Sequence, residues 1–338
     1  MKFNLLKGKK VWPIIFFLIF VLFFLDIFYF FFTPILSHRD TPVVYSLWPG
    51  TSYWKSANQL HSRGLLSRPS YWLALGFLEG NLKHLKAGDY QISPGVTTPH
   101  QLLSQMLVGK GVLYSVTIPE GWTFAQMKEA ISKNPYLKHM ENASTDILSR
   151  LNLIIKFKYP EGYFFPETYY FVRWTPEEKV YEKAYQTMEE KINTAWLARA
   201  PDLPYNNQEE VLIVASLIEK ETAQHDERPL VAGVILNRLK KRMYLQIDAC
   251  VIYGLQDNYR GKLTKEDLKT ETAYNLYLHK GLPPTPICLP SFDSIHAALH
   301  PIQTESLFYV SRGDGTHQFS KTLKEHQTAI NKYLRHKT

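Results

Sequence analysis

The sequence predicts an α+β protein with a single N-terminal transmembrane helix, a small α/β module and a larger, mixed α+β domain. Three observations support this fold class. An apolar run of about bilayer-spanning length fills residues 11–33. Three strand–turn–helix patterns follow it, and the densest group of distinctive motifs begins at Glu209. A chain of 338 residues is long enough for about two globular domains.

The first ten residues carry four lysines and form a short tail before the apolar run. Positive charge before the span and much less of it in the following "PILSHRDTP" predicts a cytoplasmic N-terminus, with residues 34–338 outside the cytoplasm. The run ends in the aromatic sequence "YFFF" and has no small-residue cleavage site, so we expect an uncleaved anchor over residues 11–33. Asp26 lies inside the run, and we expect it near the outer end of the span.

Composition argues against a nucleic-acid partner. The net charge of +8 includes the four N-terminal lysines, so the remaining chain is only mildly basic, and it has no basic clusters interleaved with aromatic residues. The two cysteines, Cys250 and Cys288, do not make a disulfide framework in a chain of this length, and their pairing stays open.

Residues 41–120 are predicted to form the small module. Its patterns lie in "VYSLWPGTSYWKSANQLHSRGLL", "GDYQISPGVTTPHQLLSQMLVGKG" and "YSVTIPEGWTFAQMKEAISKN", each an extended segment, a Pro-Gly or Pro-Glu-Gly turn and an amphipathic helix. A further helix is expected over residues 68–85. The expected N-caps are Thr51 or Ser52, Thr97 and Thr123. The arrangement is similar to a LysM-like glycan-binding module, and an inert spacer is the alternative.

Residues 121–338 are predicted to form the larger domain. Up to residue 207 it is expected to be mostly helical, interrupted by an aromatic loop around Pro160 and Pro166. A helix ending in "EKET" follows, and then a second helix over "LVAGVILNRLKKR", with Asp226 as its cap and Pro229 in its first turn. The alternation in "MYLQIDACVIYGL" predicts a strand with Gln246 and Asp248 on one face. A proline-rich loop and a hairpin turning at "GDG" complete the chain.

Glu219 and Glu221 stand at the end of the helix in "VASLIEKETAQ". Glu221 continues the apolar stripe of Val214, Leu217 and Ile218, whereas Glu219 follows a face of smaller, partly polar residues. Desolvation of a carboxyl raises its pKa, which suits a general acid near neutral pH, so Glu221 is the better candidate acid. The alternative is that both glutamates form ion pairs with Arg228, Arg238 or Lys220 and only stabilise the helix end.

Taken together, the motifs resemble those of the MltG-type (YceG-like) endolytic murein transglycosylases, and the resemblance covers nearly the whole chain. The sequences that carry it are "EGYFFPETY" (161–169), "ASLIEKET" (215–222), "VILNRL" (234–239), "LQIDACVIYG" (245–254), "AYN" (273–275), "GLPPTPI" (281–287) and "FYVSRGDGTHQFSKTLKEH" (308–326). The family's catalytic glutamate falls on Glu221, in agreement with the helical-face argument. Gln246, Asp248, Tyr253, Tyr274 and Asn275 are the expected sugar or peptide contacts, with loop scaffolding as the alternative for each.

The resemblance implies a lytic transglycosylase that cuts the MurNAc–GlcNAc β-1,4 bond within peptidoglycan strands and ends the elongation of nascent strands. Glu221 would protonate the glycosidic oxygen and then accept the proton of the C6 hydroxyl, giving a 1,6-anhydro end without a second carboxylate or a cofactor. The implied location is the bacterial inner (plasma) membrane, with the catalytic part outside the cytoplasm. Partnership with cell-wall synthases is left open. Ala249-Cys250 and Ser291 depart from the residues common in the family and affect expected substrate contacts.

Two other functions are compatible with the sequence. One is a non-catalytic, membrane-tethered peptidoglycan-binding scaffold, and the other is a muramidase that uses water, with Glu167 or Asp248 as the second carboxylate. A metal site is not expected, because His296 and His300 have i, i+4 spacing without the "HExxH" pattern or a third ligand.

Overall fold

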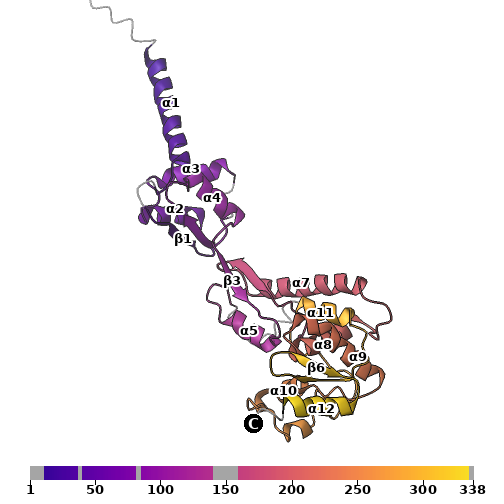
Figure 1. The fold of residues 1–338 in the computed structure, drawn as a ribbon. Coiled ribbons are helices and arrows are strands. Elements are labelled where there is room, and N and C mark those ends of the chain that lie inside the picture. The colour runs from indigo at the N-terminus through magenta and orange to yellow at the C-terminus, as the bar shows by residue number, and fades with distance from the viewer. Residues whose placement is uncertain (1–10, 37–39, 81–84, 140–158, 335–338) are drawn as a thin grey trace, which may run out of the picture. The chain divides into compact units, whose positions relative to one another are not determined.

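The computed structural model describes residues 11–36, 40–80, 85–139 and 159–334, and they form an α+β structure in two compact units (Figure 1). The first unit runs to Ser115 and also includes Pro135–Lys138 and Tyr170–Thr175. The second contains the rest of the chain from Val116. The division expected between a module over residues 41–120 and a domain over residues 121–338 stays a prediction.

Helix α1 (Val11–Phe32) begins the first unit. In the part of the chain that the structure describes, it is the one helix long and apolar enough to cross a membrane, with a mean hydropathy of 2.8. Most of its side chains are exposed, but Phe30 and Phe31 near its C-terminal end are buried in the core of the unit. The end of the apolar helix is therefore part of the module.

The rest of the first unit surrounds a short antiparallel pair of strands. In it β1 (Val43–Leu47) pairs with β2 (Gly88–Ile92), and Tyr45 lies opposite Tyr90. Helices α2 (Tyr53–Ser62), α3 (Pro69–Leu78) and α4 (Pro99–Val108) contribute to a core in which Tyr45, Trp72 and Tyr90 are fully buried. The predicted strand–turn–helix order is confirmed in this unit, while the likeness to a LysM module stays a prediction.

The helix caps agree with the sequence at two of three positions. Ser52 caps α2 by accepting a hydrogen bond from the Lys55 amide, and Thr123 caps α5 (Phe124–Ser132) in a capping box. The prediction of Thr97 as the cap of α4 is wrong, because Thr98 occupies that position and its hydroxyl accepts from the Gln101 amide. Thr97 instead accepts a hydrogen bond from the Ser93 amide within the preceding turn.

The second unit is built around helix α8 (Gln208–Glu221), in which every residue from Val211 to Ile218 is buried. It packs against four helices, namely α7 (Glu178–Leu197), α9 (Arg228–Lys240), α10 (Asp248–Leu255) and α11 (Phe292–Leu299). Short 3-10 helices occupy His225–Glu227, Gln256–Asn258 and Asp267–Lys269. The chain then forms an antiparallel hairpin of β5 (Phe308–Ser311) and β6 (His317–Ser320), followed by α12 (Leu323–Tyr333). A separate strand pair, of β3 (Leu113–Thr117) and β4 (Thr168–Val172), includes residues assigned to both units.

The predicted strand over "MYLQIDACVIYGL" is wrong. Residues 243–247 form a loop, and α10 begins at Asp248. Cys250, Val251 and Leu255 form the buried face of this helix, and so short an apolar run does not distinguish a helix from a strand by its period. Gln246 has a left-handed backbone with φ of 52°, which turns the chain into α10.

Three smaller differences concern helix ends and missing elements. Pro229 lies in the first turn of α9 as predicted, but Asp226 belongs to the preceding 3-10 helix and Glu227 holds the N-cap position without a side-chain bond. Strand β4 and helix α12 were not predicted. The helical expectation for 140–158 falls outside the described residues.

Candidate active site

Glu221 is the last residue of α8 and opens onto a cleft of about 290 Å³. The buried stripe of α8 holds the helix in the core, and Thr222 ends it by taking an extended backbone conformation. The cleft is lined by residues from six parts of the second unit, which are Glu221, Arg238, Gln246, Asp248, Tyr277, Tyr309 and His326. The candidate acid therefore stands at the wall of a polar cleft, as its place at the end of the stripe predicts.

The carboxyl group of Glu221 has one strong hydrogen bond. The Tyr309 hydroxyl donates to Glu221 Oε2 at 2.6 Å. Burial raises the pKa of Glu221, and the nearby Asp248 charge adds to this effect. The Tyr309 hydrogen bond and the charges of His317 and Arg238 oppose it without cancelling it. Glu221 consequently holds its proton to higher pH than an ordinary glutamate.

Tyr309 lies on β5 and is held by aromatic neighbours on the hairpin. Its ring meets His317 edge-on at 5.6 Å between centroids and packs on Phe319 at 5.8 Å. Burial, followed by the charge of Glu221, raises the pKa of Tyr309 well above its usual range, so the phenol remains a donor. Sequence reasoning missed this residue, although it stands in the hairpin motif "FYVSRGDGTHQF", whose alternation could have placed it on the inner face.

Gln246 and Asp248 share the cleft with Glu221, as predicted, although a loop and a helix start place them there instead of a strand. The backbone N–H of Gln246 donates to the Leu276 carbonyl at 3.1 Å, and this bond fixes the turn. Asp248 is exposed and accepts a hydrogen bond of 2.5 Å from the Tyr277 hydroxyl. Tyr277, two residues after the "AYN" motif, was not among the predicted site residues.

Tyr253 and Tyr274 are not among the cleft-lining residues of the described chain. Their rings contact each other at 4.9 Å between centroids. The Tyr253 hydroxyl donates to Glu161 Oε2 at 3.1 Å, and the Tyr274 hydroxyl is hydrogen-bonded to Thr285 Oγ1 at 2.8 Å. Both tyrosines therefore support the elements around the cleft in this structure.

Asn275 is fully buried, and its side chain supports a loop. Its Nδ2 donates to the carbonyls of Leu268 and Thr270, and its Oδ1 accepts from the Tyr277 amide. A side chain with no exposed surface does not contact a sugar, so the scaffolding alternative describes Asn275 and the predicted sugar contact does not fit this structure. It acts on the site by fixing the loop that carries Tyr277.

Glu161 is a second buried acid, and sequence reasoning missed it. It is 5% exposed and accepts hydrogen bonds from the Phe124 amide at 2.9 Å and from Tyr253. Burial raises the pKa of Glu161 to about 7, although both hydrogen bonds act in the opposite direction. Glu161 opens "EGYFFPETY", and the next residue, Gly162, has φ of 84° with no room for a Cβ beside Pro286.

Glu219 forms an ion pair with Arg228, which is one of the partners that the sequence offered as an alternative to a catalytic role. Its Oε1 lies 3.2 Å from Arg228 Nη2, and both side chains are almost completely buried. Its Oε2 accepts from the amide and the hydroxyl of Ser291, which caps α11. Glu219 therefore connects α8, α9 and α11 and is structural, whereas Glu221 faces the cleft.

Arg238 and His326 complete the wall of the cleft. Arg238 donates through Nε to the Leu307 carbonyl and through Nη1 to the Leu245 carbonyl, each at 2.6 Å. Its guanidinium is thereby fixed beside Glu221 and Asp248. His326 stacks on Phe308, and burial together with the Arg238 charge lowers the pKa of its imidazole. The cleft thus combines acids with a fixed cation and a neutral imidazole.

The cysteines and histidines singled out in the sequence take no part in the cleft. Cys250 and Cys288 are free thiols buried in the core. His296 and His300 stack on each other at 4.3 Å, and the described residues contain no group of side chains arranged to hold a metal ion. Glu167, considered as a second carboxylate, is exposed and is not among the cleft-lining residues.

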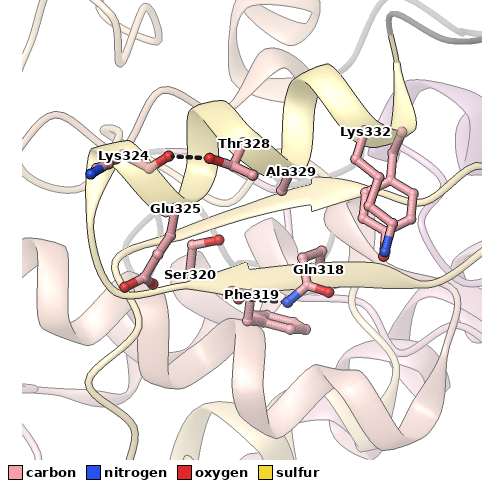
Figure 2. Close-up of a pocket in the computed structure, with 9 residues that line it drawn as sticks. Gln318, Phe319, Ser320, Lys324, Glu325, Thr328, Ala329 and Lys332 are labelled. Atoms are coloured by element: carbon pink, nitrogen blue, oxygen red, sulfur yellow. Dashed lines mark hydrogen bonds between the residues drawn. The ribbon is translucent and has the colours of Figure 1, made fainter.

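A larger cavity of about 400 Å³ lies between β6 and α12, lined by residues that include Phe319, Lys324, Glu325 and Lys332 (Figure 2). Its one carboxyl, Glu325, accepts a hydrogen bond from the Lys321 amide at the start of α12. Thr328 donates to the Lys324 carbonyl within the helix. Because the one carboxyl of this cavity is bonded to the start of α12, the smaller cleft at Glu221 is the better candidate for acid–base chemistry.

Comparison with known proteins finds relatives of this chain. The chain is 30% identical over 267 residues to the endolytic murein transglycosylase of Bacillus subtilis, covering 74% of this chain and 73% of that protein. It is 26% identical to the protein of the same name from Streptococcus pneumoniae, and the match spans 76% of this chain but about half (52%) of that relative. A crystal structure of a yceG-like protein from Listeria monocytogenes superimposes with a TM-score of 0.54 at 27% identity, covering 86% of this chain and 99% of that one. The sequence model of the YceG-like family matches residues 46–332, and the chain therefore belongs to the YceG-like family.

Proposed function

We propose that the chain is an endolytic lytic transglycosylase that cleaves the β-1,4 bond between MurNAc and GlcNAc within peptidoglycan strands. The observation that carries this proposal is Glu221, a carboxyl with a raised pKa that is hydrogen-bonded to Tyr309 at the wall of a polar cleft. The names of the Bacillus and Streptococcus relatives support the same activity.

The proposed reaction needs one carboxyl group. Glu221 donates its proton to the glycosidic oxygen while the C1–O bond of MurNAc breaks, and GlcNAc leaves as an alcohol. The resulting carboxylate accepts the proton of the MurNAc C6 hydroxyl as O6 bonds to C1. The products are a 1,6-anhydroMurNAc end and a GlcNAc end, and Glu221 is protonated again. The reaction consumes no water.

The other cleft residues suit the binding of a polar glycan. Within the described chain, Glu221 Oε1 makes no hydrogen bond, so this oxygen is available to the substrate while Tyr309 holds Oε2. Gln246 and Asp248 present an amide and a carboxylate, and Arg238 presents a cation for a carboxylate of the substrate. Tyr253 and Tyr274 are proposed to act from behind the cleft.

The first unit is proposed to anchor the enzyme and contact the glycan. Helix α1 suits a single-pass anchor in the bacterial inner membrane, and the lysines before it favour a cytoplasmic N-terminus. In the module, the half-exposed ring of Trp48 contacts that of Trp174 at 4.5 Å between centroids, and the Arg173 guanidinium lies over Trp174. An exposed tryptophan ring supported by a second aromatic side chain suits stacking on sugar rings, which is the binding role expected of a LysM-like module.

Product analysis tests this function directly. The full chain in detergent is incubated with uncrosslinked glycan strands, and the fragments are identified by mass spectrometry. Fragments longer than a disaccharide with anhydro ends support the proposal. Reducing ends would instead indicate a water-using muramidase, for which Asp248 is the available second carboxylate in the cleft. Intact strands that remain bound would indicate a scaffold.

A further inference from the structure

Helix α1 is long enough to cross a bilayer only when its C-terminal turns are included in the span. These turns also pack against the module. Residues 11–25 precede the segment packed into the module core and span roughly 22 Å at about 1.5 Å per residue. The hydrocarbon core of a bilayer is about 30 Å thick. The lysines at positions 7, 9 and 10 prevent the apolar span from extending toward the N-terminus. The turns from Asp26 onward are therefore needed to complete the crossing.

The C-terminal half of α1 contacts α3. The Tyr71 ring meets Phe23 edge-on at 6.4 Å and Phe30 at 5.4 Å between centroids. Asp26, the one charged residue of α1, forms an ion pair with Arg68 and accepts a hydrogen bond of 2.8 Å from the Tyr71 hydroxyl. Figure 1 shows α3 beside the C-terminal end of α1. The start of α3 therefore lies beside the turns that complete the crossing.

The outer face of α3 is apolar. Trp72, Leu75 and Gly76 point into the module core, and the helix contains no charged residue. On the other side, Phe77 and Leu78 are each 73% exposed. Ala74 is also exposed and lies one turn before Leu78, so the three residues form one uncovered stripe at helical spacing. Within a soluble module such a stripe would expose large apolar side chains to water.

We propose that α3 is an interfacial helix whose Ala74–Phe77–Leu78 stripe is inserted into the outer leaflet of the membrane that α1 crosses. The inference rests on the anchor role of α1 in the proposed function. Two independent features place the lipid there: the span completes its crossing alongside α3, and the Asp26–Arg68 pair neutralises the charge at that depth. The apolar stripe then contacts acyl chains, and Arg68 at the opposite end of α3 stays paired with Asp26.

The test uses a fluorescent label on the full chain in vesicles of phosphatidylethanolamine and phosphatidylglycerol. Leu78→Cys is labelled with an environment-sensitive dye, and labelling is selective because Cys250 and Cys288 are fully buried. The matched control is Leu197→Cys, an 84% exposed leucine of the second unit. The expected result is that the dye at position 78 emits at shorter wavelength and is quenched by lipids with a shallow spin label, whereas the dye at position 197 shows neither effect.

Adding Phe77→Glu to the Leu78→Cys chain should reduce the quenching, because it places a charge in the stripe. The inference is overturned if the dye at position 78 behaves like the control while the chain resists extraction from the vesicles by alkaline carbonate. Extraction by carbonate would refute the anchor itself and with it this inference. Glycan cleavage measured in the same vesicles tests the proposed activity separately, since neither labelled position is in the cleft.

Discussion

The hydroxyl of Tyr309 donates a hydrogen bond of 2.6 Å to Glu221 Oε2, joining strand β5 to the end of helix α8. The two residues are 88 positions apart in the sequence. The bond occupies one oxygen of the carboxyl group and leaves the other facing the cleft. The bond also stabilises the charged form of Glu221, so it partly offsets the rise in pKa that burial causes. The geometry therefore sets both the orientation and the acidity of the candidate acid.

Glu221→Gln should abolish glycan cleavage while leaving the fold and glycan binding intact. Glutamine keeps the volume of the side chain but does not transfer a proton, and general acid–base catalysis is typically worth about 10²–10⁴-fold. The free energy of unfolding should be unchanged or slightly higher, because a desolvated carboxyl is removed. Product formation and thermal unfolding are compared with those of Glu190→Gln, an exposed glutamate of α7. Retained anhydro-product formation in Glu221→Gln would show that another residue is the acid.

Tyr309→Phe should move the alkaline limb of the pH–rate profile to higher pH. The hydrogen bond from Tyr309 lowers the pKa of Glu221, so its loss lets burial raise that pKa further. The reaction requires protonated Glu221 at its start, so activity persists to higher pH. The maximal rate should fall, since a hydrogen bond to a charged group is worth about 1.5–3 kcal/mol. A limb that stays in place or moves to lower pH would contradict the proposed role of the bond.

Glu219→Gln should lower stability without removing the chemistry. The structure shows a buried ion pair between Glu219 and Arg228, and breaking such a pair typically costs about 3–5 kcal/mol. Denaturant unfolding measures the loss, with Glu190→Gln again as the exposed control. Activity per folded molecule should stay near that of the unmodified chain. Wild-type stability together with lost activity would reverse the roles assigned to the two glutamates.

Glu161 should make stability depend on pH between about 4.5 and 7. Its pKa in the folded chain is about 7 against an ordinary value of 4.5, so the folded state binds the proton more tightly than the unfolded state. The corresponding stabilisation, about 3 kcal/mol as an upper estimate, is fully present below pH 4.5 and lost as the pH rises through 7. Glu161→Gln mimics the protonated acid and should remove this dependence. Unfolding curves at several pH values give the difference, and identical curves for the two chains would refute it.

Trp48→Ala should weaken binding of the full chain to insoluble peptidoglycan, measured in the Glu221→Gln background so that the glycan is not cut. Trp48 contributes the exposed ring of the aromatic pair with Trp174. Trp54→Ala is the matched control, because Trp54 is also exposed (61%) and lies on α2 of the same unit. Cleavage of short soluble strands, which need only the cleft, should be unaffected by Trp48→Ala. Equal binding by the two tryptophan variants would remove the glycan role of the pair.

The sequence predicted the elements whose signals are local. The strand–turn–helix units, the long apolar helix, the buried stripe of α8 and the "GDG" hairpin all depend on patterns within a few turns of chain, and each is present. The helix at Asp248 was missed because an apolar run of this length suits either secondary structure. Side-chain partners were harder to predict, because a hydrogen bond such as that of Tyr309 or an ion pair such as that of Glu219 depends on tertiary packing between distant segments.

The order in which the cleft residues occur along the chain bears on how the protein is made. Glu221 is synthesised well before Tyr309 and His326, which lie on β5 and α12 near the C-terminal end. In the proposed topology, a chain that is still emerging from the ribosome and crossing the membrane has its acid but lacks the donor that orients it. It would become competent only when export is almost complete. A premature stop before Phe308 should accordingly leave an anchored, inactive protein in the cell envelope.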